Sequence, residues 1–519
     1  MKDGVAERSE RKPRRGTPEK PVTYGKTYRT NGSPSNYMKS QRAERAIEER
    51  VIGKRLDAGL LYHKFPQQFS AERRRIALLT PYSGGNLGDA AIQDAVIANL
   101  RLRLPNAQFS GLTLNDDNFM RRHGTGAFPL YASRRPFYRW PRQSVADPWH
   151  DESCAGPART RHLVLSALKQ LLSRTPGLGS CLKAIYSFAS RAYGEFLHSV
   201  RGYRFLRMHH LLIVSGGGQL DEEWGGPWGH PFALFKWAVL ARIARVPYAI
   251  ASVGACKLDS VGCRLFLAAA LRLAQYRSYR DKNSREAAKR LLRGAALDPV
   301  VPDMAFTVSP PAEIQSISRD RLVIAVSPIA YARPGSWAHE NAALYDRYLQ
   351  EMANVILQLL RQGHFLAIAC SSLGDDDRVV PEILERLDDE AKQRFAQQLH
   401  IPTITSWKDF TALLMDVDFL IASRLHSTIL AFVVGTPTIA ISFDPKVDWV
   451  MEDLGQTDYL LHISDFRAAD VVEALHRLQI RRDTAVKQIA SYLQSIPSAS
   501  KLQYDTLAKL ALNWERRRS

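Results

Sequence analysis

The sequence of 519 residues predicts an α/β protein with two doubly wound domains and a cleft between them. Short, almost continuously apolar runs alternate with segments of helical spacing, as in parallel sheets that helices cover on both faces. This alternation occurs twice, and a polar, proline-containing segment at 309–320 separates the two series as a candidate linker. We therefore expect an N-terminal domain at 71–308, a C-terminal domain at 321–500 and a final basic helix at 501–519.

The first series begins directly after a basic N-terminal segment. Strands are expected at 76–83, 108–114, 211–218, 247–254 and 276–281, and helices at 89–104, 231–245, 261–275 and 283–293. An insertion at about 115–208 interrupts the alternation. Its second half, 161–208, has the spacing of one or two amphipathic helices.

The second series follows the linker. Strands are expected at 321–328, 365–372, 401–406, 418–423 and 437–443, and helices at about 341–362, 376–389 and 424–434. In open parallel sheets, ligands bind beyond the carboxyl ends of the strands. Residues that directly follow a strand are therefore the candidates for function.

Basic residues are concentrated at the N-terminus. The chain has 71 Lys and Arg against 52 Asp and Glu, a net charge of +19, and residues 1–75 contain 19 basic and 9 acidic residues. Residues 1–70 are also rich in Pro, Gly and Ser, which predicts a largely disordered arm. Such an arm attracts phosphates or an anionic membrane surface. A solvated tail without a partner is the alternative.

Several features favour a cytoplasmic protein, with the inner face of the membrane as a further location. The 5 cysteines contain no CxxC pair, which favours a reducing compartment and argues against a zinc ribbon. No apolar run reaches the ~20 residues of a spanning helix. The basic N-terminus lacks the apolar segment of a secretory signal.

The strongest local signal is SRLHSTILAFVVGTPTIAISFDPK at 423–446. A strand is expected to end before Ser423, which we expect to cap a helix whose first turn contains Arg424 and His426. Cations at a helix N-terminus are unfavourable unless an anion binds there. Arg424 could hold a carboxylate or phosphate bidentately, and His426 could exchange protons near neutral pH. Lys446 would enter the same crevice, and no metal is expected.

Two glycine-rich turns also follow strands. In PYSGGNLGDAAI (81–92), Asp89 is expected to cap the helix and Asn86 to bind a hydroxyl. In VSGGGQLDEEWGGPWGHPF (214–232), Gly216, Gly217 and Gly218 provide a backbone surface that a ligand can approach. The acids and tryptophans after them would suit a sugar. A tight turn and a packed loop are the structural alternatives.

These segments, together with YRDKNS (279–284) and VPDMAF (301–306), resemble the polysaccharide pyruvyl transferase family over roughly residues 75–465. The resemblance implies two Rossmann-like domains of the GT-B type. It also implies transfer of pyruvate from phosphoenolpyruvate to two hydroxyls of a saccharide, forming a ketal. By the same resemblance, Arg424 and His426 are catalytic and Arg280 is a second donor-binding arginine. Many relatives have another acid where this chain has Ala90.

The expected partners are therefore phosphoenolpyruvate as donor substrate, with no cofactor, and a saccharide acceptor, for which a lipid-linked glycan is one option. Nucleic acid is not expected. Two other functions remain open. One is a nucleotide-sugar glycosyltransferase of the same architecture. The other is a non-enzymatic protein that binds polyanions or a membrane surface through the arm at 1–70.

Overall fold

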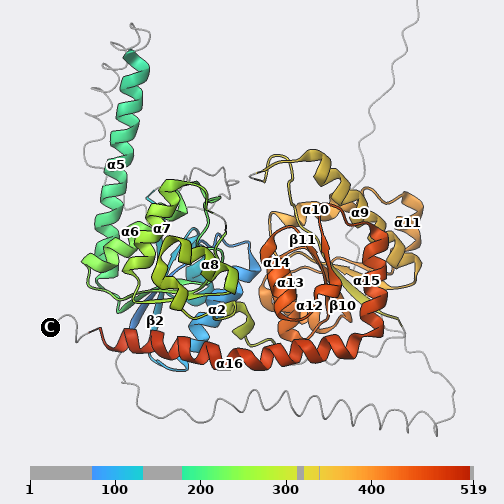
Figure 1. Cartoon of the computed structure of the whole chain (residues 1–519). Helices are drawn as coiled ribbons and strands as arrows, with labels where there is room; N and C mark the ends of the chain where they lie inside the picture. The colour runs from blue at the N-terminus through green and yellow to red at the C-terminus, as the bar shows by residue number, and fades with distance from the viewer. Residues whose placement is uncertain (1–72, 133–177, 257, 312–320, 338, 515–519) are drawn as a thin grey trace, which may run out of the picture. The chain divides into compact units, whose positions relative to one another are not determined.

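The computed structural model describes residues 73–132, 178–256, 258–311, 321–337 and 339–514, with the side chains of 178–190 left out (Figure 1). Two parallel sheets form its framework, as the sequence predicts. We call the part at 73–311 the N-terminal lobe and the part at 321–481 the C-terminal lobe. The expected arm at 1–70 and the Arg-rich part of the insertion lie outside the described residues, as does most of the expected linker.

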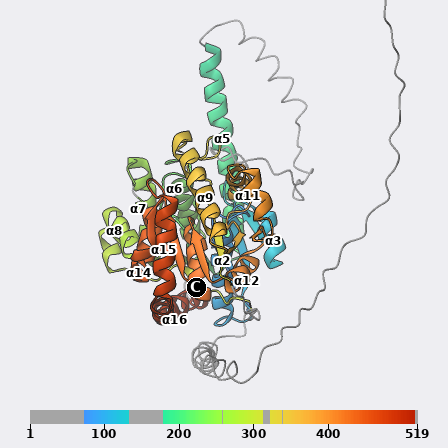
Figure 2. The ribbon, with the colours of Figure 1, turned by 90° about the vertical axis from the view of Figure 1, so that its right-hand side faces the viewer.

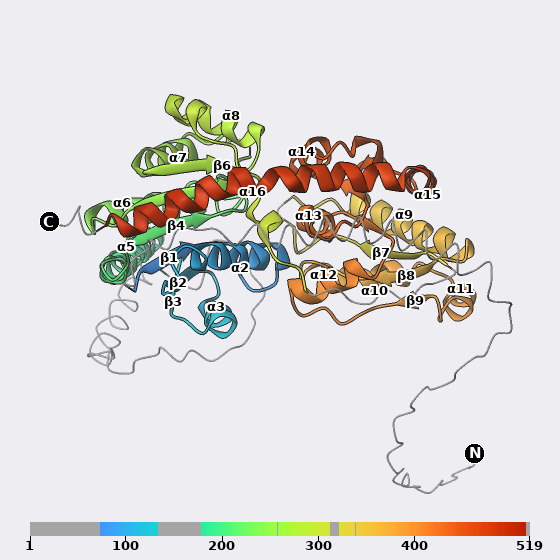
Figure 3. The ribbon, with the colours of Figure 1, turned by 90° about the horizontal axis from the view of Figure 1, so that it is seen from below.

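The first sheet has the order β3-β2-β1-β4-β5-β6, and all of its strand pairs are parallel (Figure 3). Its strands are β1 (Arg75–Leu79), β2 (Gln108–Thr113), β3 (Ala127–Pro129), β4 (Leu211–Ser215), β5 (Tyr248–Val253) and β6 (Tyr276–Tyr279). The order reverses between β1 and β4, so the loops after these two strands diverge to opposite sides and leave a crevice between them.

Helices cover both faces of this sheet. They are α2 (Leu87–Arg101), α3 (Asp116–His123), α5 (Leu178–Leu206), α6 (His230–Ile243), α7 (Val261–Leu273) and α8 (Lys282–Leu291), with short 3₁₀ turns η2 (Arg293–Leu297) and η3 (Met304–Thr307). Alternate strand residues serve opposite faces: Ile76 and Leu78 share one buried cluster with α2, while Ala77 and Leu79 share another with α6 and α7. Burial on both faces explains why these strands are continuously apolar.

The second sheet has the order β12-β11-β10-β7-β8-β9, again with parallel pairs. Its strands are β7 (Val323–Ser327), β8 (Phe365–Ile368), β9 (Leu399–His400), β10 (Phe419–Ala422), β11 (Thr438–Ser442) and β12 (Leu460–His462). The strand expected at 401–406 was wrong, because pairing stops at His400. Pro402 has no N–H for the ladder, and the hydroxyl of Ser406 instead caps the next helix.

The helices of the C-terminal lobe alternate with these strands. They are α9 (Ala342–Arg361), α10 (Val379–Leu384), α11 (Asp389–Arg394), α12 (Trp407–Met415), α13 (Leu425–Val434), α14 (Pro445–Asp453) and α15 (Ala468–Ile480), with 3₁₀ turns η4 (Asp376–Arg378) and η5 (Thr457–Tyr459). Figure 2 shows α9 beside α15, which pack against each other. The single helix expected at 376–389 is thus a 3₁₀ turn followed by a short helix.

The last helix, α16 (Arg482–Leu512), connects the two lobes, and Figure 3 shows it passing along both. It begins at residue 482, rather than at 501 as expected, and contains Pro497. Its first half packs on the C-terminal lobe through Ile489, which belongs to the same buried cluster as α15. In its second half, Asp505 pairs with Arg103 of the N-terminal lobe at 2.6 Å. The buried Gln503 accepts a hydrogen bond from the Ser278 hydroxyl at 2.5 Å.

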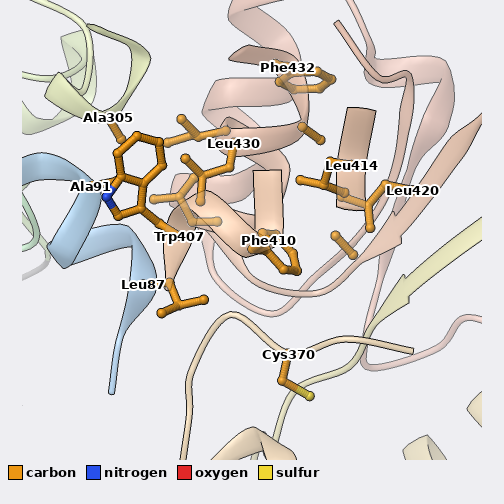
Figure 4. Packing of buried hydrophobic residues seen from close by; sticks show 14 of the residues in the cluster. Leu87, Ala91, Ala305, Cys370, Trp407, Phe410, Leu414, Leu420, Leu430 and Phe432 are labelled. Carbon is orange, nitrogen blue, oxygen red and sulfur yellow. The ribbon is translucent and has the colours of Figure 1, made fainter. Parts of the chain in front are cut away.

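The two lobes also pack directly on each other. Figure 4 shows the indole of Trp407 beside Ala91 of α2 and Ala305 of η3. The Nε1–H of Trp407 donates to Asp94 of α2 at 2.6 Å. In the described part of the chain, no helix is long and apolar enough to cross a membrane.

Candidate active site between the lobes

The candidate site lies where α13 of the C-terminal lobe meets the carboxyl edge of the first sheet. His426, the second residue of α13, places its ring directly against Gly88 of α2. A Cβ built on Gly88 would lie 2.0 Å from Cγ of His426, so any side chain at 88 would displace the imidazole. This close contact explains why residue 88 is a glycine. The sequence around Gly88 did not indicate it.

Asp303 links His426 to Arg280. The carboxylate Oδ2 of Asp303 lies 3.8 Å from Nε2 of His426 and 3.6 Å from Nη1 of Arg280. Its Oδ1 accepts the backbone N–H of Ala305 at 3.0 Å and so caps η3. Burial would raise the pKa of Asp303, but His426, Arg280 and the Ala305 N–H together lower it below its ordinary value. Asp303 is therefore an ionised carboxylate inside the site.

Arg280 follows the end of β6, and its guanidinium lies on the backbone of Gly254 after β5. Its nearest carboxylate contacts are 3.4 Å to Asp281 and 3.6 Å to Asp303. Both are longer than the 2.7–2.9 Å that is usual for charge-assisted hydrogen bonds, so the guanidinium is only loosely held. Asp281 caps α8 by accepting the N–H of Ser284.

Arg280 and Lys446 line one pocket, although they come from different lobes. Its lining residues are Arg280, Asp281, Asp303, Phe306, Leu425, Ile429, Lys446, Val450, Asp453 and Tyr492. The ammonium of Lys446 also pairs with Asp444 at 2.7 Å. The pocket therefore contains cations, but it is not simply cationic as the sequence analysis expected, because aspartates lie beside them.

Asp89 lies in the same site. Burial raises its pKa and Asp303 adds to the rise, whereas His426, Arg280 and Lys446 oppose it. These five groups are thus close enough to influence one another electrostatically. Four of them are site residues predicted from the sequence: Asp89, Arg280, His426 and Lys446. The fifth, Asp303, was not predicted as a site residue. Asp303 could have been named from the sequence, because it lies in the VPDMAF segment that contributes to the family resemblance.

Arg424 does not point at this cluster. Its Nε and Nη2 donate to the two carboxylate oxygens of Asp376 at 2.7 and 2.8 Å. Asp376 is fully buried and follows β8, 48 residues earlier in the chain. The guanidinium also lies over the ring of Trp337, 5.6 Å from its centroid. The expected bidentate partner of Arg424 is therefore already present within the protein.

The N-terminus of α13 also differs from the prediction in how it is capped. Arg424 is the N-cap residue, and no side chain caps the helix. Ser423, which we expected to cap it, instead shares a hydrogen bond with the hydroxyl of Tyr348 at 3.2 Å. The predicted cap by Ser423 is therefore wrong, because the N-cap position lies one residue later, at Arg424.

The first glycine-rich turn is used mainly to join the lobes. The N–H of Leu87 donates to the carbonyl of Ser371, and that of Leu373 donates to the carbonyl of Gly85. Asn86 caps α2, since its Oδ1 accepts the N–H groups of Gly88 and Asp89. The expectation that Asp89 caps this helix was therefore wrong. Asn86 already occupies that position three residues earlier, and the carboxylate of Asp89 is left for the site.

The second glycine-rich turn borders the site. Gly216 and Gly217 have φ of +55° and +69°, which favour glycine. A Cβ on Gly216 would lie 2.8 Å from Ile92, whereas one on Gly217 would lie 3.5 Å from the carboxylate of Asp89. At Gly218 the same construction meets nothing within 4 Å. Gly216 is thus required for packing, the buried Gly217 lies beside Asp89, and open space begins at Gly218.

The acidic loop after this turn has two roles. Glu222 accepts the backbone N–H groups of Asp259 and Ser260, so its carboxylate serves the fold rather than a ligand. Burial and Asp221 raise the pKa of Glu223, while Lys446 lowers it, which places Glu223 within electrostatic range of the other lobe. Among the described residues, no group of three His, Cys, Asp or Glu side chains could hold a metal ion.

The comparison with protein families decides the assignment. The family model described as polysaccharide pyruvyl transferase matches residues 86–445. The chain belongs to this family. The match begins at Asn86 within the first glycine-rich turn, spans the second turn and the YRDKNS and VPDMAF segments, and ends at Pro445, one residue before Lys446. The structure brings these segments to the interface of the lobes. No curated protein matches the sequence.

A solved structure shares the fold of this family member, and others resemble it less. A protein classed as a UDP-N-acetylglucosamine 2-epimerase from Listeria monocytogenes has a TM-score of 0.50 at 9% identity, covering 84% of this chain and 98% of its own. The corresponding enzyme from Methanocaldococcus jannaschii has a TM-score of 0.45 at 9% identity, with coverages of 78% and 92%. A UDP-glucose:anthocyanidin 3-O-glucosyltransferase has 0.48 at 12%, with 86% and 100%. The two parallel sheets and the fold of the Listeria protein confirm the expected GT-B-like arrangement of two Rossmann-like domains.

Proposed function

We propose that this transferase moves pyruvate from phosphoenolpyruvate onto two hydroxyls of a saccharide and forms a ketal. The main support is one arrangement: Arg280 and Lys446 line a single pocket beside Asp303, and Asp303 also neighbours His426. Phosphoenolpyruvate has a carboxylate and a phosphate. Arg280 from one lobe and Lys446 from the other offer a cation to each of these two anionic groups, beside the aspartates that also line the pocket.

Arg280 is the first candidate for contact with the donor, because its guanidinium is buried but only loosely paired. Lys446 would exchange its contact with Asp444 for one with the ligand. For Arg424 we propose a positioning role in place of the catalytic role that the resemblance implies. We propose that its pair with the buried Asp376 fixes the start of α13, and thereby the position of His426.

His426 is the proposed acid and base. In the first step it protonates the methylene carbon of the donor while a sugar hydroxyl oxygen bonds to the central carbon; that hydroxyl returns its proton to His426. In the second step the other hydroxyl bonds to the same carbon and phosphate leaves with the second proton. A positioned acid–base group of this kind contributes about 10²–10⁴ in rate.

The test is phosphate release from phosphoenolpyruvate in the presence of candidate glycans, with the mass of the glycan product followed in parallel. We expect phosphate release to require a glycan and to fall about 10²–10⁴-fold in His426→Gln. The exposed His476→Gln on α15 is the matched control and should keep its activity, since His476 lines neither pocket. Unchanged phosphate release in His426→Gln would contradict the proposed role. A product made only from a nucleotide sugar would favour the glycosyltransferase alternative.

A further inference from the structure

A second pocket lies at the carboxyl ends of β11 and β12 in the C-terminal lobe. Its lining residues are Tyr331, Leu344, Ser442, Phe443, Asp444, Pro445, Asp448, His462, Ile463 and Ser464. This is the edge at which ligands bind in open parallel sheets. None of the motifs in the sequence analysis accounts for Tyr331, Asp448 or the segment 462–464.

Aromatic rings form one wall of this pocket. The rings of Tyr331 and Phe443 lie 5.2 Å apart, and Trp337 packs against both at 5.3 and 5.8 Å. All three side chains are half-buried, so part of each ring remains accessible. Half-buried aromatic rings with a few polar groups beside them are typical of binding sites for small ligands.

The polar groups of the pocket disfavour an anion. Asp444 and Asp448 line it, and none of its lining residues in the described chain is Lys or Arg. Oδ1 of Asp448 is buried and has no hydrogen-bond partner in the described part of the structure. A buried carboxylate oxygen is costly unless a donor reaches it. The pocket therefore suits a neutral ligand that donates hydrogen bonds.

The two pockets are neighbours with complementary chemistry. Lys446 lines the first pocket, Asp444 lines the second, and the two side chains form an ion pair at 2.7 Å. The first pocket has Arg280 and Lys446 beside its aspartates and can pair with an anion, whereas the second has carboxylates with no Lys or Arg among its described lining residues and offers them, with its aromatic rings, to hydroxyls. A nucleoside diphosphate would bring negative charge next to Asp444 and Asp448, which is unfavourable.

We propose that this second pocket binds one neutral sugar residue of the acceptor, with its apolar face against Tyr331 and Phe443 and a hydroxyl donating to Asp448. The inference rests on the proposed function in that the sugar is taken to be the acceptor. Ligand binding in the two pockets can nevertheless be measured separately. The proposed sugar pocket and the proposed donor can therefore be refuted independently.

The experiment uses the full chain and methyl glycosides of D-galactose, D-glucose, D-mannose and N-acetyl-D-glucosamine as probes. Saturation-transfer NMR reports glycoside binding, and a thermal-shift titration reports phosphoenolpyruvate binding. Asp448→Asn and Tyr331→Leu alter the proposed sugar pocket. Asp389→Asn and Tyr193→Leu are the matched controls, since both residues are exposed and lie on the distant helices α11 and α5.

We expect at least one glycoside to bind the unaltered protein and both pocket variants to weaken that binding at least tenfold. The controls should bind as the unaltered protein does. The thermal shift by phosphoenolpyruvate should persist in Asp448→Asn, since Asp448 does not line the first pocket. Binding that is unchanged in the pocket variants, or no binding by any probe, would overturn the inference. Competition by uridine diphosphate that depends on Asp448 would also overturn it. Glycoside binding without a response to phosphoenolpyruvate would instead contradict the proposed donor.

Discussion

Nε2 of His426 and Oδ2 of Asp303 lie 3.8 Å apart across the interface of the two lobes, too far for a hydrogen bond, and neither atom has a hydrogen-bond partner in the described structure. Both atoms are buried, so each is expected to gain a partner when a ligand is bound or when the lobes approach slightly. Asp303 is thus the group best placed to orient the imidazole and to stabilise its charged form.

Replacing Asp303 by Asn should lower kcat for phosphate release by at least about tenfold. The upper limit is about 10⁴-fold, the loss found when the carboxylate of a comparable carboxylate–histidine pair becomes an amide. The amide keeps the volume of the side chain but removes the charge that faces His426. Asp303→Glu retains the charge and should recover part of the lost activity. If Asp303→Asn has normal kcat at every pH tested, Asp303 does not position His426.

Gly88→Ala should move the imidazole of His426, because the added methyl group would overlap the ring. We expect a loss of phosphate release of about tenfold or more, since small displacements of reacting groups can cost about 10²-fold. Gly294→Ala is the control, because a Cβ at Gly294 meets nothing within 4 Å. Kinetics and thermal unfolding of the two variants should be compared. Full activity in Gly88→Ala would show that the close approach has no role in catalysis.

Arg424→Met should destabilise the protein by about 3–5 kcal/mol, because it leaves the fully buried Asp376 without its cation. Arg333→Met is an informative comparison. Arg333 also binds Glu382 through two nitrogens, but both side chains are about a quarter exposed. That pair should contribute about 1 kcal/mol or less. Chemical denaturation gives the free energy of unfolding of both variants. An equal decrease in Arg424→Met and Arg333→Met would contradict a structural role for the Arg424–Asp376 pair.

Asp89→Asn should increase stability at neutral pH. Burial raises the pKa of Asp89 in the folded protein, so the unfolded chain loses its proton at lower pH. Asp89 therefore contributes fully below the unfolded pKa of about 3.9, and its contribution falls as pH rises through the folded pKa. The melting temperature of Asp89→Asn should exceed that of the unaltered protein at pH 7–8, and the two should converge near pH 4. A lower melting temperature of the variant at pH 8 would show that ionised Asp89 is stabilised in the site.

The alternation of strands and helices was predictable because both sheets are buried on two faces, so strands such as Val323–Ser327 are continuously apolar. Helix ends were less predictable. Asn86 and Asp89 are both good cap residues, and only the structure shows that Asn86 is used. The convergence of Asp89, Arg280 and His426 followed from the rule that sites lie at strand ends.

The partners of the site residues could not be predicted from local sequence. Asp376 reaches Arg424 from the start of η4, 48 residues earlier in the chain, and nothing in either segment indicates the pair. The same holds for the aromatic wall, where Tyr331 and Phe443 follow two different strands. Such contacts depend on the order of strands in the sheet, which apolar periodicity does not determine.

The most direct test of the account is a thermal-shift titration with phosphoenolpyruvate and with uridine diphosphate. Arg280→Gln and the exposed Arg290→Gln on α8 serve as the altered site and its matched control. We predict that phosphoenolpyruvate raises the melting temperature of the unaltered protein and of Arg290→Gln, that the rise is reduced in Arg280→Gln, and that uridine diphosphate has no effect. A rise with uridine diphosphate and none with phosphoenolpyruvate would contradict the central claim that the pocket between Arg280 and Lys446 holds the pyruvate donor.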